Sequence, residues 1–260
     1  MPEILEIEYY RRAFQRAVGR TIVTIEAPDS WYLKGGLVAE DLVAALIGAT
    51  IERTRRTGKL LLGDLDSGHV LGLRFGMTGR LIVDDDAVIE HLEYSSMRDE
   101  PAWDRLVVRF ADGGDFRMRD PRRLGGVLLD PDETMLGIDA FTVTVGDVRM
   151  LLGASSAPLK ARLMDQGRLA GMGNLLTDET LWRAGLDPAR PANSLSAAES
   201  KRLHKHLRAT LDDLLVRGGS HTGDLMAERH RNGVCPKDAT PLARRTIGGR
   251  TTYSCPRHQR

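Results

Sequence analysis

The stretch PLKARLMDQGRLAGMGNLLTDE, residues 158–179, places helical segments on either side of glycine-rich turns. Its GMGN turn opens a helix, and the first N–H groups of a helix have no partner within the helix. The turn should therefore present unpaired backbone N–H groups together with the side-chain amide of Asn174. Such a helix start suits a phosphate group, although a plain helix cap is the alternative reading of the same residues.

The helical pattern continues on both sides of this stretch, from residue 131 to about residue 228. VGDVRMLLG precedes it, and LSAAESKRLHKHLRATLDDLLVRGG follows it with a serine N-cap at Ser196 and a glycine stop. We expect a helical domain of about four helices here.

The first 130 residues have a different pattern. EILEIEYYRRAFQRAV places Ile4, Ile7 and Phe14 at roughly helical spacing, which predicts a helix almost at the start of the chain. From residue 21 to about residue 130, short β-branched runs alternate with turns such as DSGH, GMTG and DGGD. Many short strands at this spacing predict a β-sandwich or barrel.

The segment from Arg229 onward is basic and rich in turns. It holds eight Lys or Arg residues and a single acid, Asp238, whereas the whole chain of 260 residues has a net charge of +1. PLARRTI and RTTYS flank a GG pair, which predicts a tight β-hairpin. A basic hairpin indicates an anionic partner, with nucleic acid as the leading candidate and a solvated basic tail as the alternative.

The chain has two cysteines, Cys235 and Cys255, and both lie in this hairpin segment. A disulfide framework therefore cannot hold the fold together, and a reducing cytoplasm fits this cysteine content. No stretch approaches the roughly 18 continuous apolar residues of a membrane helix. The acidic start of the chain also lacks the pattern of a signal peptide, so we expect a cytoplasmic protein with no membrane segment.

The chain begins MPE, and removal of the initiator methionine would leave Pro2 with a free secondary amine. An α-amino group has a pKa of about 8, so an appreciable fraction is uncharged and nucleophilic at neutral pH. Attack on an anomeric carbon gives an iminium ion, and the neighbouring acid Glu3 is suited to pass a proton to the sugar oxygen. Many unrelated proteins begin with the same three residues, so this motif needs support from the rest of the chain.

That support comes from a resemblance along nearly the whole sequence. MPEILEIEYYRRAF resembles the N-terminal motif of the formamidopyrimidine-DNA glycosylase and endonuclease VIII family, usually MPELPEVE followed by RR. RRTGKLLL, FGMTG, DPRRLGG and residues 158–179 resemble further family motifs in the same order, and the ribbon at the end of the chain supplies GGRTTY.

The resemblance implies a bifunctional DNA glycosylase and AP lyase of base excision repair that acts on damaged double-stranded DNA. Pro2 would attack C1′, Glu3 would assist the proton transfers, and both flanking phosphates would leave by β,δ-elimination. Lys59 would contact the phosphate next to the damaged nucleotide or help to open the sugar. The remaining implied site residues are Met77, Arg122 and Leu124 as wedges in the base stack, Lys160, Asn174 and Arg250 on one backbone phosphate, and Glu6 and Glu179 around the lesion pocket and the phosphate-binding turn.

The resemblance also implies a C-terminal zinc ribbon, but this chain departs from the usual pair of CxxC motifs. The two motifs are Cys235-Pro-Lys-Asp238 and Cys255-Pro-Arg-His258, so the second and fourth ligands are altered. Histidine is a common zinc ligand, whereas a structural zinc site with aspartate is uncommon and should bind more weakly. A hairpin with Zn²⁺ on these four residues and a hairpin that folds without metal both remain open.

Two further departures concern the substrate. The stretch between Gly218 and Cys235 is much shorter than in family members that remove 8-oxoguanine, where it includes a loop over the flipped base. A shorter stretch implies an open pocket, which favours oxidised pyrimidines, ring-opened purines or bulky adducts. Leu124 stands where the family has phenylalanine, so the opposite-base preference stays open.

Together these features predict an α+β protein. We expect an N-terminal β-sandwich with a leading helix over residues 1–130, a helix-two-turn-helix domain over 131–228 and a zinc-ribbon-like β-hairpin over 229–260. DNA would lie in a basic cleft between them, and we expect a monomer associated with the bacterial nucleoid. A damaged-DNA-binding protein without catalysis, and a glycosylase specialised for bulky alkylated or crosslinked bases, remain as alternatives.

Overall fold

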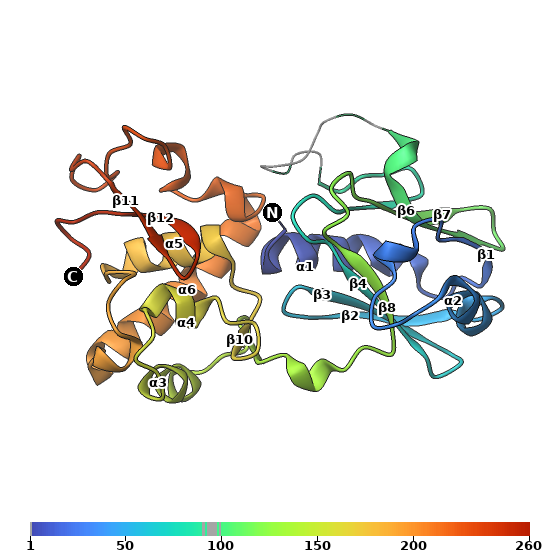
Figure 1. Cartoon of the computed structure of the whole chain (residues 1–260), viewed down its shortest axis with the longest axis horizontal. Helices are drawn as coiled ribbons and strands as arrows, with labels where there is room; N and C mark the ends of the chain where they lie inside the picture. The colour runs from blue at the N-terminus through green and yellow to red at the C-terminus, as the bar shows by residue number, and fades with distance from the viewer. Residues whose placement is uncertain (1, 90–91, 93–97, 99) are drawn as a thin grey trace. The chain divides into compact units, whose positions relative to one another are not determined.

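The computed structural model describes residues 2–89, 92, 98 and 100–260. The chain divides into two compact units (Figure 1). Each unit has its own hydrophobic core. The first unit contains Pro2 and Glu6–Glu133, and the second contains Glu3–Leu5 and Thr134–Arg260. The division into three functional parts stays a prediction.

The first unit is a β-sandwich with a leading helix, α1 (Ile4–Phe14), as the sequence predicted. Its two antiparallel sheets have four strands each, in the orders β1-β6-β7-β5 and β2-β3-β4-β8. The strands are β1 (Ile22–Glu26), β2 (Ile51–Thr57), β3 (Leu60–Leu65), β4 (Val70–Arg74), β5 (Arg80–Val83), β6 (Asp104–Phe110), β7 (Asp115–Arg119) and β8 (Gly126–Leu129).

From Glu6 onward, helix α1 packs in the sandwich core with its apolar residues on one face, whereas Ile4 and Leu5 at its start pack in the core of the second unit. Ile7, Tyr10 and Phe14 are buried, and the ring centroid of Phe14 lies 4.9 Å from that of Phe116 on β7 in an edge-to-face arrangement. A second helix, α2 (Ala39–Leu46), was not expected from the sequence.

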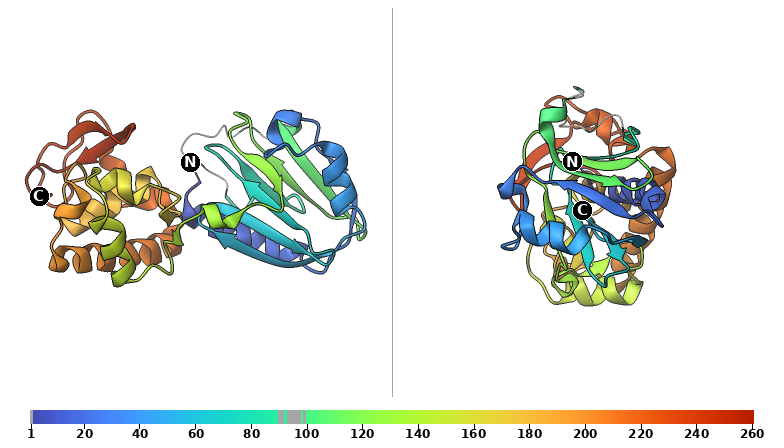
Figure 2. Two further views of the ribbon diagram at one scale, coloured as in Figure 1. Left: turned by 60° about the horizontal axis from the view of Figure 1, so that its bottom comes forward. Right: turned by 90° about the vertical axis from the view of Figure 1, so that its right-hand side faces the viewer.

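The second unit holds the four expected helices and the expected hairpin. The helices are α3 (Val145–Gly153), α4 (Leu159–Leu163), α5 (Asn174–Ala184) and α6 (Ala197–Arg217); the strands are β9 (Ile138–Asp139) and β10 (Leu169–Ala170), which pair in parallel, and β11 (Ala243–Ile247) and β12 (Arg250–Ser254), which form the hairpin. Figure 2 shows the hairpin and the long helix α6 on different sides of this unit. The predicted α+β architecture is confirmed.

Capping residues fix the ends of α6 as the sequence predicted. The Ser196 hydroxyl accepts a hydrogen bond from the Glu199 backbone N–H, and the Glu199 side chain accepts one from the Ser196 N–H, which forms a capping box. Gly218 ends the helix in the left-handed conformation, with φ of 113°. Among the described residues, no helix has the length and apolar character needed to cross a membrane.

Candidate functional site

The residues that follow Pro2 are held at the start of α5. Glu3 is fully buried, and its carboxylate accepts hydrogen bonds from the backbone N–H groups of Leu175 at 2.8 Å and Leu176 at 3.2 Å. The next residue, Ile4, donates its N–H to the Gly171 carbonyl at 3.1 Å. The chain immediately after the predicted nucleophile is thus fixed to the turn that opens α5.

This contact corrects one expectation from the sequence. The N–H groups of Leu175 and Leu176 are not unpaired, because the Glu3 carboxylate occupies them. Gly173 makes room for that carboxylate, since a Cβ at this position would come within 2.2 Å of the Glu3 carboxyl carbon. Asn174 is half buried, and its Oδ1 has no hydrogen-bond partner in the described part of the chain. A phosphate at this turn would therefore meet the Asn174 side chain rather than a bare helix end.

Lys160 lies in a buried charge cluster beneath the hairpin. Its Nζ is 2.7 Å from Asp178 Oδ1, and both side chains are fully buried. The ammonium also donates to Thr252 Oγ1 at 2.8 Å, while Arg229 pairs with the other oxygen of Asp178. Burial lowers the pKa of Lys160, and the Asp178 charge opposes that effect. A direct phosphate contact would require this ammonium to leave Asp178.

Arg250 is exposed at the first residue of β12. The middle of the same strand is anchored to α4 and α5 through the buried cluster, because Thr252 bonds to Lys160 of α4 and the Tyr253 N–H lies 3.3 Å from Asp178 Oδ2 of α5. Lys160 and Asp178 therefore position the strand that carries Arg250.

The first unit brings Met77, Arg122 and Leu124 together on two adjoining turns. A Cβ at Gly76, next to Met77, would lie 2.4 Å from the Leu124 carbonyl carbon, so the two backbones are in direct contact. Met77 is half buried, Arg122 is exposed, and Leu124 is 50% exposed. The three residues predicted to act as wedges thus belong to one surface feature.

A buried carboxylate that the sequence did not single out joins these turns. Asp120 is fully buried, and it accepts hydrogen bonds from Thr78 Oγ1 at 2.5 Å, from the Arg122 N–H at 3.2 Å and from the Gly125 N–H at 2.8 Å. Burial raises the pKa of the neighbouring Tyr32 hydroxyl, and the Asp120 charge adds to that effect. The DPRR motif marked a turn, but only the fold shows that its aspartate also binds the turn of Met77.

Near the C-terminus, Cys235, Asp238, Cys255 and His258 offer ligand atoms that lie within 4.8 Å of one another. Cys235 Sγ is 3.5 Å from His258 Nδ1, and Cys255 Sγ is 3.5 Å from both Asp238 oxygens. Two sulfurs, one imidazole nitrogen and one carboxylate oxygen form a donor set that Zn²⁺ accepts. The residues therefore fit a zinc ion, with a weaker ligand at Asp238 than the usual cysteine.

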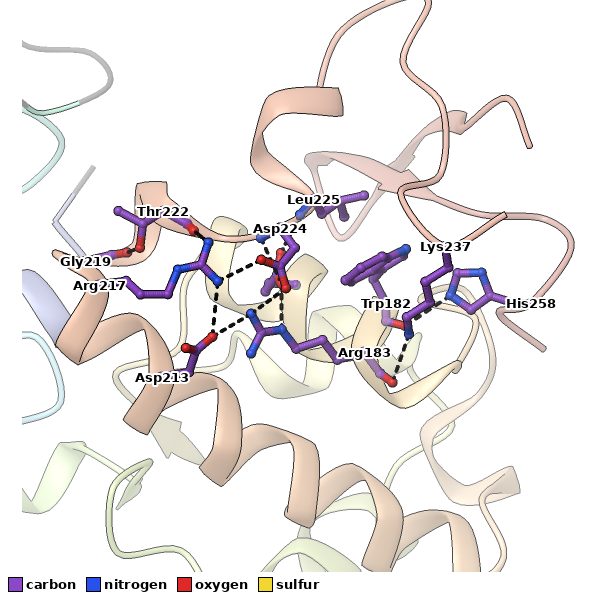
Figure 3. Close-up of polar contacts among 11 residues, drawn as sticks. Trp182, Arg183, Asp213, Arg217, Gly219, Thr222, Asp224, Leu225, Lys237 and His258 are labelled. Atoms are coloured by element: carbon purple, nitrogen blue, oxygen red, sulfur yellow. Dashed lines mark hydrogen bonds and ion pairs between the residues drawn. The ribbon is translucent and has the colours of Figure 1, made fainter. Parts of the chain in front are cut away.

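Trp182 on α5 contacts two members of this cluster, a role that the sequence did not reveal; Figure 3 shows its contact with His258. Its indole N–H donates to Cys235 Sγ at 3.3 Å, and its carbonyl accepts from His258 Nε2 at 3.1 Å. That bond places the proton on Nε2 and leaves the Nδ1 lone pair for a metal. A hydrogen bond from the Thr240 N–H lowers the pKa of Asp238, so this ligand is a carboxylate at neutral pH.

Comparison with known proteins gives the family. Residues 1–127 match the formamidopyrimidine-DNA glycosylase N-terminal domain, and residues 136–225 match the formamidopyrimidine-DNA glycosylase H2TH domain. The chain belongs to the formamidopyrimidine-DNA glycosylase (Fpg) family. It is 31% identical to the Fpg of Geobacillus kaustophilus over the full length of both proteins, and 31% identical to that of Methylobacillus flagellatus over 98% of this chain and 95% of the relative.

Solved structures agree with this assignment. The Lactococcus lactis Fpg bound to DNA containing N7-benzyl-Fapy-dG superposes with a TM-score of 0.83 and 26% identity over all of both chains. The same enzyme in complex with abasic-site DNA gives a TM-score of 0.83 at 25% identity, again over all of both chains. The suspected family resemblance is confirmed.

In this Fpg-family chain, Glu179 anchors the short segment that follows α6. Its buried carboxylate accepts the N–H groups of Asp224 at 3.1 Å and Leu225 at 2.9 Å, and Arg183 Nε at 2.6 Å. The anchor continues into an ion-pair network made of Arg183, Asp213, Arg217 and Asp224 (Figure 3). The contacts of Glu179 thus fix residues 224–225, which lie in the short stretch between Gly218 and Cys235.

Two further predicted site residues, Lys59 and Glu6, belong to the first unit. Lys59 is half buried in the turn between β2 and β3, directly before the start of β3. Glu6 is buried on α1. Their roles in the family site stay predictions.

Proposed function

We propose that this protein is a bifunctional DNA glycosylase and AP lyase of base excision repair, acting on damaged double-stranded DNA at the bacterial nucleoid. The observation that carries the proposal is the position of Glu3. Its carboxylate is one residue from the prospective N-terminal amine and is fixed at the turn that presents Asn174. The family relatives carry the glycosylase name, and the Lactococcus lactis Fpg complexes contain damaged DNA.

The proposed reaction begins when the Pro2 nitrogen, freed by removal of Met1, attacks C1′ of the damaged nucleotide. A C1′–N bond to Pro2 forms, the bond from C1′ to the base breaks, and the base leaves. Glu3 passes a proton to the sugar ring oxygen as the ring opens, which leaves an iminium ion on Pro2. Loss of sugar protons then expels the two flanking phosphates in turn, and water releases the amine.

Strand incision at a single abasic site tests this function. The Met-processed protein should cut the abasic strand and leave a phosphate on each side of the gap, while Pro2→Gly should not. Tight, salt-sensitive binding without incision by the wild-type protein would instead support the damage-recognition protein. A flat response to salt would count against DNA as the ligand, because phosphate contacts give protein–DNA affinity its salt dependence.

The phosphate grip in this proposal rests on Asn174 and Arg250, with Lys59 beside the damaged nucleotide. Lys160 does not contact the phosphate in this proposal. It is a positioning residue for β12, through its contacts with Asp178 and Thr252. This differs from the direct contact first expected, and it follows from the burial of the Lys160 ammonium.

Ring-opened purines, oxidised pyrimidines and bulky adducts are the proposed substrates. The segment after α6 is held against α5 and α6 by Glu179 and Arg183, which leaves it little length to fold over an extruded base. A relative, the Lactococcus lactis Fpg, has been crystallised with a benzyl-bearing ring-opened purine in DNA. A panel of duplexes with one lesion each tests the choice, and faster release of 8-oxoguanine than of all three classes would contradict it.

The two wedge turns should work as one unit because Asp120 bonds to both. Thr78→Val removes one of these bonds and leaves a buried acceptor short of a partner, which typically costs about 1–3 kcal/mol. We expect a roughly 10-fold or greater drop in single-turnover excision from a fully paired duplex, which is the size that such a loss gives. Asp120→Asn should lower single-turnover excision from the paired duplex further than Thr78→Val does.

Two controls separate wedging from simple loss of structure. Thr78→Ser keeps the hydroxyl and should restore excision. An abasic site placed opposite a gap has no base pair to open, so Thr78→Val should process it at close to the wild-type rate. Equal losses on the paired and gapped substrates would show that Asp120 and Thr78 only support the fold.

The cluster of Cys235, Asp238, Cys255 and His258 would hold Zn²⁺ as a structural cross-link of the hairpin. Because thiolate is the stronger zinc ligand in such sites, Asp238→Cys should tighten zinc binding by about tenfold or more. Cys255→Ser should weaken it. Zinc content and competition with a chromophoric chelator measure both effects without reference to activity. Purified protein that holds no zinc and keeps its hairpin in excess chelator would contradict the proposal.

A further inference from the structure

The exposed side of α6 carries a row of basic side chains that the proposed reaction does not use. Leu203, Leu207 and Leu211 bury one side of the helix in the core. On the other side lies a depression of about 660 Å³, with Val145 and Ala198 among its lining residues. Its charged and imidazole lining consists of Lys201, Arg202, His204, Lys205, His206 and Arg208, and it includes no carboxylate.

The cations here are only partly neutralised. Lys201 and Lys205 are exposed and form no ion pair within the described residues. Arg208 lies 3.6 Å from Asp212 and Arg202 lies 3.9 Å from Glu199, so these two cations are partly neutralised. Glu199 is already engaged by Arg190 at 2.6 Å, which holds the pKa of Glu199 at about 2. The depression therefore presents a net positive charge to solvent.

The spacing of these residues matches a repeating anion. Lys201, Lys205 and Arg208 follow one another at i, i+4 and i+7, so they form a single row along α6. A rise of 1.5 Å per residue makes the row roughly 10 Å long. Phosphates on one DNA strand follow at about 3.4 Å along the duplex axis, so the row spans about three of them.

The elements of the proposed lesion site lie elsewhere. Asn174 begins α5 and Arg250 lies on the hairpin, whereas this depression is built by α3 and the first half of α6. We propose that this α6 surface is a second DNA site that binds the backbone of an undamaged duplex segment while the lesion site is occupied. The proposal goes beyond the excision reaction, although it assumes that the protein works on DNA.

The test fills the lesion site first and then measures binding of a second duplex. Full-length protein is joined to a short abasic duplex by borohydride, and a fluorescent undamaged duplex is added. We expect a salt-sensitive ternary complex. Lys201→Gln with Lys205→Gln should weaken it about tenfold and reduce the salt slope by roughly two, as expected for two lost phosphate contacts.

A matched control removes the same charge elsewhere. Arg53→Gln with Arg109→Gln also deletes two exposed cations, both on strands of the first unit, and should leave the second duplex bound as in the wild type. Failure of the wild-type complex to bind a second duplex, or equal loss in both double variants, would overturn the proposal. Stronger binding of polyglutamate than of the duplex would assign the surface to an acidic protein instead.

Failure of the proposed Pro2 reaction can be distinguished from failure of the α6 proposal. If borohydride gives no covalent complex, the lesion site can be saturated with an excess of tetrahydrofuran-containing duplex before the labelled duplex is added. The same comparison of variants then decides the α6 proposal independently.

Discussion

Glu3→Gln is expected to lower single-turnover excision by about 10²–10⁴-fold, the usual contribution of a positioned acid–base group. Glutamine has nearly the same shape as glutamate, and its amide oxygen can still accept one of the two N–H groups of α5. The loss of the second acceptor should lower the free energy of unfolding by about 1–3 kcal/mol, while the binding of an abasic duplex should change little. Stopped reactions with enzyme in excess, together with a thermal unfolding curve, measure the two effects separately.

Glu8→Gln is the matched control, because it is the same substitution five residues further along the chain, on helix α1. The Glu8 carboxylate pairs with Arg11 at 2.9 Å and is partly exposed. The Glu8→Gln variant should therefore excise the base at close to the wild-type rate. Near wild-type excision by Glu3→Gln as well would mean that Glu3 only caps α5, and the proposed proton transfer would be wrong.

Asp178→Asn is expected to lower the free energy of unfolding of the second unit by about 3–5 kcal/mol, the usual result of removing one partner from a buried ion pair. The substitution leaves two cations without their counter-charge, because Lys160 and Arg229 both bind this carboxylate. Urea unfolding followed by Trp182 fluorescence, with Trp31 and Trp103 replaced by phenylalanine, reports on this unit alone.

Two further variants show whether the loss of stability is specific to Asp178. Lys160→Met leaves Asp178 paired with Arg229, so it should destabilise less than Asp178→Asn. Asp187→Asn breaks a partly exposed pair with Arg245 of the hairpin and should cost about 1 kcal/mol or less. If Asp178→Asn were no more harmful than Asp187→Asn, the buried cluster would not be what holds β12 in place.

Much of the fold could be predicted because its signals are local. The spacing of Ile7 and Phe14 predicts the leading helix, and Ser196 and Gly218 predict the ends of α6. The four metal-ligand candidates could also be predicted, because their CxxD and CxxH spacings resemble a zinc ribbon. These signals need only a few neighbouring residues.

The missed features depend on pairings between distant parts of the chain. Glu3 and Leu175 are separated by 172 positions, and Thr78 and Asp120 by 42. Nothing in the neighbourhood of either residue shows that the other will be its partner. The burial of Lys160 was missed for the same reason, since a lysine near a helix start is ordinarily expected at the surface.

Borohydride trapping on a duplex with one abasic site, followed by peptide mapping, tests the central claim most directly. Protein lacking Met1 should form a covalent adduct on Pro2, and the adduct should be absent from Pro2→Gly and from protein that retains Met1. An adduct on a lysine, or no adduct despite tight binding, would contradict the assignment of Pro2 as the nucleophile.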